Sequence, residues 1–105
     1  MKIGVNLLLW CGGFSDENIP LIERVAALGY DGVELPVFAP KNVTAKSVKK
    51  ALDDTGMGCN ICSVVPPDSS LIDPDIEARQ RGVDYLKTMV ELADNIGAEV
   101  ICGPN

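Results

Sequence analysis

Two cysteines, Cys59 and Cys62, have the C-x-x-C spacing found in metal sites and in redox-active disulfides. Such a pair works when both sulfurs reach one point, or when it lies at a helix N-terminus that lowers the thiol pKa. Here the pair lies in a short apolar run that predicts a strand, in which residues three apart point to opposite faces. We therefore interpret both as small buried hydrophobic residues. Cys11 and Cys102 complete the cysteines, and no disulfide framework is expected without a secretion signal.

Three polar side chains, Asn6, Glu34 and Asn60, share one face of the strands that the sequence predicts. The other face is almost entirely apolar: Ile3, Val5, Leu7, Val33, Leu35, Cys59 and Ile61. We expect the apolar face to pack against helices, which leaves the polar groups on the inner face of a sheet. The alternatives are that the three face solvent in an open sheet, or make ordinary buried hydrogen bonds.

A sequence pattern of helix, glycine and strand occurs three times along the chain. Apolar residues at helical spacing lead to Gly29, Gly56 and Gly97, and a short apolar strand follows each glycine. The strands are expected at residues 32–35, 59–62 and 99–102, and a first strand at residues 2–10 precedes them. Strands that alternate with helices in this way predict an α/β protein with a parallel sheet.

The ends of the helices and the lengths of the loops suggest a barrel. Ser15, Thr44 and Asp73 are expected to cap the three helices, with Pro74 at the first position of the third. The loops after the strands are longer than the turns before them, as in β/α barrels whose active face is built from the loops after the strands. The pattern predicts a half-barrel, the first four strands and three helices of a TIM (β/α)₈ barrel.

The chain is too short to form a complete barrel. A complete barrel needs ~250 residues, whereas 105 residues form a single domain, residues 1–105. We expect the N-terminal half of a TIM barrel, and we favour a fragment of a longer chain over a half-barrel that completes itself by association. Because an open sheet leaves one face and two edges bare, we expect a homo-oligomer if the chain stands alone.

Charge and hydropathy exclude several classes of partner. The net charge is −6, and the nine Lys and Arg residues form no cluster, so no nucleic-acid partner is expected. No apolar run approaches the ~18 residues of a membrane span. The N-terminal apolar stretch lacks a small-residue cleavage site, and a cytoplasmic location is therefore expected.

Three segments together spanning nearly the whole chain resemble a known family. They are KIGVNLLLW followed by a loop aromatic, IERVAALGYDGVEL, and DPDIEARQRGVDYLKTMVELADNIGAEVICG. They resemble the N-terminal half of the xylose isomerase-like sugar phosphate isomerases and epimerases, and most of all the ketose 3-epimerases that act on D-tagatose and D-psicose.

The resemblance implies a metal-dependent isomerase or epimerase of carbohydrate metabolism. Its members hold one divalent cation (Mn²⁺, Mg²⁺ or Co²⁺) and move a proton of a small ketose or related polyol through an enediolate-type intermediate. Their metal ligands, two Glu, an Asp and a His, come from later strands, and this sequence has no histidine. No metal, cofactor or catalytic residue is therefore expected in these 105 residues, and the chain alone should be inactive.

The resemblance also carries over five substrate-binding positions. Asn6 stands where relatives place an aromatic that contacts substrate, and Phe14 matches a loop aromatic that covers the sugar. Glu34 matches a strand-tip glutamate, while Cys62 and Cys102 match small pocket residues at the third and fourth strand tips. Each of these residues could instead have a structural role. Phe14 would then anchor its loop, the two cysteines would lie in the core, and Glu34 would be a structural hydrogen-bond partner.

Two further interpretations of the whole chain stay open. One is a non-catalytic half-barrel that dimerises or binds a small ligand. The other is part of an enzyme similar to inosose dehydratase or hydroxypyruvate isomerase. A DNA-repair endonuclease of similar fold is disfavoured by the acidic charge balance.

Overall fold

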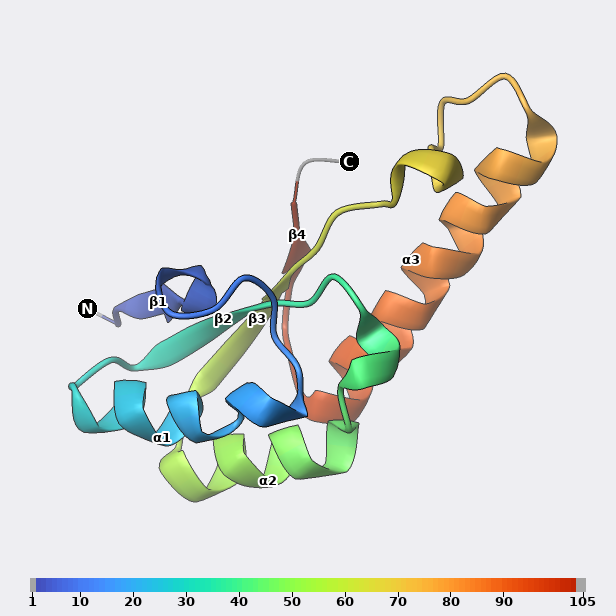
Figure 1. Cartoon of the computed structure of the whole chain (residues 1–105). Coiled ribbons are helices and arrows are strands. Elements are labelled where there is room, and N and C mark those ends of the chain that lie inside the picture. Colours follow the sequence, from blue (N-terminus) through green and yellow to red (C-terminus); the bar gives the residue numbers. More distant parts are fainter. Residues whose placement is uncertain (1, 104–105) are drawn as a thin grey trace.

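A four-stranded parallel sheet organises the chain in the computed structural model, which describes residues 2–103 (Figure 1). The strands are β1 (Gly4–Asn6), β2 (Gly32–Pro36), β3 (Gly58–Cys62) and β4 (Ile101–Cys102). They lie in the order β1-β2-β3-β4, and each pairs in parallel with the next. The predicted parallel order is confirmed.

Three helices connect the strands, and all three end as the sequence predicts. They are α1 (Pro20–Ala27), α2 (Ala45–Thr55) and α3 (Ile76–Ile96). Four short 3₁₀ turns accompany them: η1 (Leu7–Leu9), η2 (Asp16–Asn18), η3 (Pro40–Asn42) and η4 (Pro67–Ser69). Gly29, Gly56 and Gly97 have positive φ angles of 98°, 66° and 80°, a conformation that glycine adopts without steric cost.

One hydrophobic core joins the sheet to the helices. Alternate strand residues meet apolar residues of all three helices in a single cluster: Val5, Val33, Leu35, Cys59 and Ile61 with Ile22, Val25, Val48, Leu52, Met89, Leu92 and Ile96. Because the helices share this cluster, they cover the same face of the sheet. Figure 1 shows α1 and α2 below the sheet and η1 above it. Ile3, which was expected in the core, is instead 55% exposed.

The first strand is shorter than the sequence predicts, and its predicted extent to residue 10 is wrong. The Leu8 N–H donates a hydrogen bond to Asn6 Oδ1 (2.8 Å), which turns the chain into η1. The N–H groups of Trp10 and Cys11 both donate to the Leu7 carbonyl oxygen (2.9 and 3.0 Å). Asparagine side chains compete with the sheet ladder in this way. The alternation of the strand stops here, so Leu7 is buried and Leu9 is 72% exposed.

Two of the predicted helix caps are also displaced. The 3₁₀ turn η2 follows Ser15, and α1 begins only at Pro20, which suits the first helical position. The third helix is capped by Asp75, whose Oδ1 accepts a hydrogen bond from the Glu77 N–H (3.1 Å). Asp73 instead accepts from the Asp75 N–H (2.8 Å), in a turn just before the helix.

Thr44 occupies the predicted cap position of α2, but its hydroxyl bonds elsewhere. Its backbone N–H donates to Asp16 Oδ1 (2.7 Å), and its hydroxyl donates to Asp16 Oδ2 (2.6 Å). Asp16 therefore joins the loop after β1 to the start of α2. The hydroxyl bond, and then the N–H bond, hold the pKa of the Asp16 carboxyl below its ordinary value.

Replacing Asp16 by asparagine is expected to lower the free energy of unfolding at neutral pH. A depressed pKa contributes stability above the unfolded-state pKa, near 4, and this contribution is lost as the pH falls through the folded-state value. Urea unfolding at neutral pH and at about pH 3 should show the difference between wild type and variant shrinking with acid. Asp94→Asn, at an exposed position on α3, is the control. Identical pH profiles for wild type and Asp16→Asn would contradict the prediction.

The loop between β3 and α3 packs along the helix. The hydroxyls of Ser63 and Tyr85 are 2.6 Å apart and share a hydrogen bond. Arg81 donates from Nε (3.0 Å) and Nη2 (2.6 Å) to the Asp68 carbonyl oxygen. The loop is therefore held at two points along α3. Within residues 2–103, no helix is both long enough and apolar enough to cross a membrane.

Candidate functional site

Four of the five predicted site residues lie on the face of the sheet that is turned away from the helices. The strand register aligns Asn6 of β1 with Glu34 of β2, and Cys62 of β3 with Cys102 of β4. Asn60 pairs with Glu34 and shares its face. Because parallel strands all point the same way, these side chains gather at and near the carboxyl ends of the strands, where sites in β/α proteins form.

Asn6 orients the Glu34 carboxylate. Asn6 Nδ2 donates a hydrogen bond to Glu34 Oε1 (2.8 Å), while Asn6 Oδ1 accepts from the Leu8 N–H (2.8 Å). An ionised carboxylate only accepts hydrogen bonds, so the amide nitrogen must face it. The residue that ends β1 therefore also fixes the side chain at the middle of β2.

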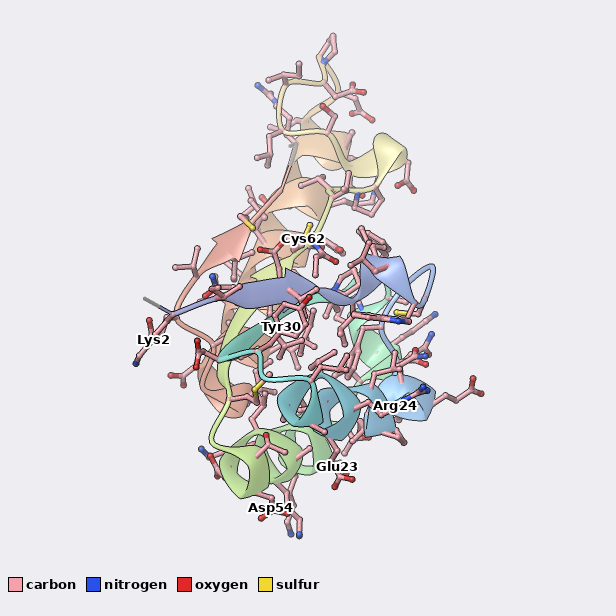
Figure 2. The ribbon with its side chains drawn as sticks, turned by 90° about the vertical axis from the view of Figure 1, so that its left-hand side faces the viewer. Lys2, Glu23, Arg24, Tyr30, Asp54 and Cys62 are labelled. Carbon is pink, nitrogen blue, oxygen red and sulfur yellow. The ribbon has the colours of Figure 1, made fainter. Side chains whose placement is uncertain are left out.

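Glu34, Cys62 and Cys102 converge at one place. Their possible ligand atoms, a carboxylate oxygen and two sulfurs, all lie within 4.8 Å of one another. Glu34 and Cys62 are partly buried, and Cys102 is exposed. Figure 2 shows Cys62 above the ribbon of β1, while Glu23 and Asp54 lie below it, by α1 and α2. Partial desolvation, then the nearby Glu34 carboxylate, raises the pKa of the Cys102 thiol.

Cys59 lies on the opposite face from Cys62, as the strand geometry predicts. It is buried in the core, and desolvation raises the pKa of its thiol to about 12. A thiol with such a pKa is inert at neutral pH. Cys59 therefore behaves as a small hydrophobic residue, whereas Cys62 points toward the polar face.

Phe14 lies apart from the four convergent residues. Its side chain is 2% exposed and belongs to the core cluster, and its backbone N–H donates to the Pro36 carbonyl oxygen (2.7 Å). Phe14 therefore anchors the loop after β1, as in the packing alternative, and does not reach the polar face. The structure brings the other four residues together without it.

An open hollow of about 440 Å³ lies over the amino-terminal part of the strands and reaches Asn6 and Glu34, but not Cys62 or Cys102. Asn6, Glu34 and Asn60 line it from the sheet, and Lys2, Asp31 and Glu99 line its far end. Lys2 and Glu99 stand at the starts of predicted strands and Asp31 directly before one, and the sequence carries no other signal for these three. Amides and carboxylates of this kind can hydrogen-bond the hydroxyls of a small polyol.

The residues present do not fit the divalent cation that the sequence resemblance implies. Mg²⁺ and Mn²⁺ prefer sites built from oxygen ligands. Within residues 2–103, the group of side chains that could hold a metal ion, Glu34, Cys62 and Cys102, has one carboxylate and two sulfurs. We therefore assign no metal-dependent chemical step to these residues.

Parallel strands in sequential order, helices on one face and polar residues at the strand ends define this chain as part of a β/α barrel. The family model described as xylose isomerase-like TIM barrel matches residues 22–104. The chain belongs to this family.

Relatives and solved structures agree with this assignment. A ketose 3-epimerase of Arthrobacter globiformis is 27% identical over 104 residues, which is 98% of this chain and 36% of the relative. An L-ribulose 3-epimerase of Mesorhizobium japonicum is 23% identical, covering 97% and 35%. A crystal structure of D-allulose 3-epimerase from Methylomonas sp. in complex with D-allulose superposes with a TM-score of 0.89 at 19% identity, covering 98% and 36%. The chain thus spans about a third of the length of these proteins.

Proposed function

We propose that these residues form the first half of a sugar epimerase or isomerase barrel that acts on a small ketose. In this proposal, Asn6, Glu34, Cys62 and Cys102 lie on the substrate-facing side of the barrel. The observation that carries it is their convergence on the polar face, at the strand ends where barrel enzymes bind substrate. The ketose and L-ribulose 3-epimerases among the relatives support this substrate class.

Each side chain has a definite part in this proposal. The Glu34 carboxylate accepts hydrogen bonds from sugar hydroxyls, and Asn6 keeps it in place through the 2.8 Å bond to Oε1. The two cysteines are small enough to leave room for the sugar beside the carboxylate. These residues bind and orient the substrate, whereas proton transfer belongs to residues outside this chain.

The purified chain is expected to bind a ketose without epimerising it. Titration with D-allulose, followed by two-dimensional NMR, should shift the backbone amides of Asn6, Glu34, Cys62 and Cys102. Glu34→Gln should weaken binding by about 1.5–3 kcal/mol, because the hydrogen bonds to a charged acceptor are lost. Glu23→Gln, on the outer side of α1, is the matched control (Figure 2).

Two outcomes would contradict this proposal. Amide shifts confined to other surfaces would remove the substrate-side assignment. Epimerisation of the ketose by the chain, with Mn²⁺ or Co²⁺ added, would show that the proton-transfer residues do lie within it. Binding of the ketose without turnover is the expected result.

A further inference from the structure

We infer that Glu34, Cys62 and Cys102 form a binding site for a thiophilic cation such as Zn²⁺. The three residues come from three adjacent strands and bring one oxygen and two sulfurs within 4.8 Å of one another. Tetrahedral zinc with bonds of about 2.0–2.3 Å to its ligands separates them by about 3.3–3.8 Å. Small side-chain rotations would therefore close this set around an ion.

The backbone around the two sulfurs is held by the sheet. The Val37 N–H donates to the Cys62 carbonyl oxygen (2.9 Å), and the Ser63 N–H donates to the Cys102 carbonyl oxygen (2.8 Å). Cys62 and Cys102 are also direct partners in the parallel register. Both sulfurs are thus presented from paired strand ends, and an ion needs only side-chain movement to bind them.

The carboxylate of the site is oriented in advance. Asn6 Nδ2 donates to Glu34 Oε1 (2.8 Å), and Asn6 is itself fixed by the Leu8 N–H. Hydrogen bonds to metal-binding side chains hold them in place, and such outer partners typically contribute to metal affinity. Asn6 is in this respect a positioning residue for the proposed site.

The local charge also favours a cation. The Glu34 carboxylate and two sulfur donors meet here. The two ion pairs in the described part of the chain, Lys49–Asp53 and Lys50–Asp54, both lie on α2, so neither neutralises Glu34. A cation bound here would therefore be the positive partner of the Glu34 carboxylate, which neither of these pairs supplies.

The donor atoms determine the class of cation. Thiolates select Zn²⁺ and Cu⁺, whereas Mg²⁺ and Mn²⁺ are bound through oxygen ligands. Three protein ligands leave a fourth tetrahedral position open, as in catalytic zinc sites. The site therefore differs in its donors from the hard-cation site that the sequence resemblance implies. The inference does not depend on the proposed sugar chemistry, because it uses only the ligand atoms of this chain.

Metal titration of the reduced chain tests the inference without any sugar. We expect one Zn²⁺ per chain in competition with a chromophoric chelator, and a sulfur-to-metal charge-transfer band when Co²⁺ is the probe. Cys62→Ser and Cys102→Ser should each weaken Zn²⁺ binding more than about 100-fold, beyond the effect of losing an outer partner. Cys59→Ala is the matched control, since its sulfur lies on the core face, and it should leave the affinity unchanged.

Two further variants keep the test decisive if a cysteine variant folds poorly by circular dichroism. Glu34→Gln preserves shape but weakens the oxygen ligand, and Asn6→Ala should cost about 10–100-fold in affinity. The inference is overturned if Zn²⁺ does not bind, or if Cys59→Ala weakens binding as much as Cys62→Ser. Displacement of Zn²⁺ by excess Mg²⁺ would likewise overturn it, because it would show a site made of oxygen ligands.

Discussion

Replacing Gly82 by alanine is expected to destabilise the fold by about 1–3 kcal/mol, although alanine is the better helix former. Gly82 is a buried position of α3, where the loop after β3 lies against the helix. A Cβ built there would overlap the Ser69 carbonyl oxygen and approach Leu71 Cδ2 to 2.8 Å. The oxygen belongs to the backbone, so it cannot rotate away, and η4 would have to move as a unit.

Urea unfolding measures this effect against a matched change on the same helix. Lys87→Ala lies at an exposed position of α3 and should change the free energy of unfolding by no more than about 0.5 kcal/mol. Gly82→Ala should also weaken the contacts of the loop, so proteolysis between β3 and α3 should become faster. A stability equal to or above that of the wild type would show that the loop is not packed tightly against Gly82.

The parts of the fold that sequence periodicity determines were predicted well. Val33, Glu34 and Leu35 alternate in burial as their parity indicates, and the positive-φ glycines mark where the helices stop. Both features are local, because side chains alternate along any strand and only glycine adopts positive φ cheaply. The order of the parallel strands follows from the repeated strand–helix–strand connections, since consecutive elements are usually neighbours in space.

The errors lie where one side chain decides between two local structures. Asn6 was expected inside a long strand, but its Oδ1 takes the Leu8 N–H and ends β1. Asp73 and Asp75 are both good helix caps, and composition alone does not choose between them. Which of the two local structures forms depends on the tertiary contacts of the segment, and the hydrophobic pattern of the sequence does not show those contacts.

The candidate site shows the same limit across strands. Glu34 and Cys62 were each expected at strand tips, but their approach to Cys102 depends on the register of β2, β3 and β4. Register arises from pairing between distant segments, which the spacing of residues along the chain does not reveal. The C-x-x-C spacing therefore drew attention to Cys59, whereas the real neighbour of Cys62 is Cys102.

The purified 105-residue chain is expected to self-associate in solution, most simply as a two-fold dimer. Leu8 of η1 and Trp10, directly after η1, are 46% and 45% exposed. In Figure 1 this first part of the chain lies above β2, whereas α1 and α2 lie below it. Burying one large apolar side chain contributes about 1.5–3 kcal/mol. Several such groups left in water would consume much of the ~5–15 kcal/mol by which a domain is stable. A second copy offers the same apolar surface in return.

Sedimentation equilibrium tests this association with a matched pair of variants. Trp10→Asp should shift the chain toward monomer, whereas Leu28→Asp, 68% exposed after α1, should leave the association unchanged. Glu34 opposes a dimer through the polar face, since each carboxylate would approach its symmetry mate. The hydrogen bond from Asn6 reduces that cost but does not remove it. A stable monomer at micromolar concentration, with sharp two-state unfolding, would contradict the prediction and show that the exposed face needs no cover.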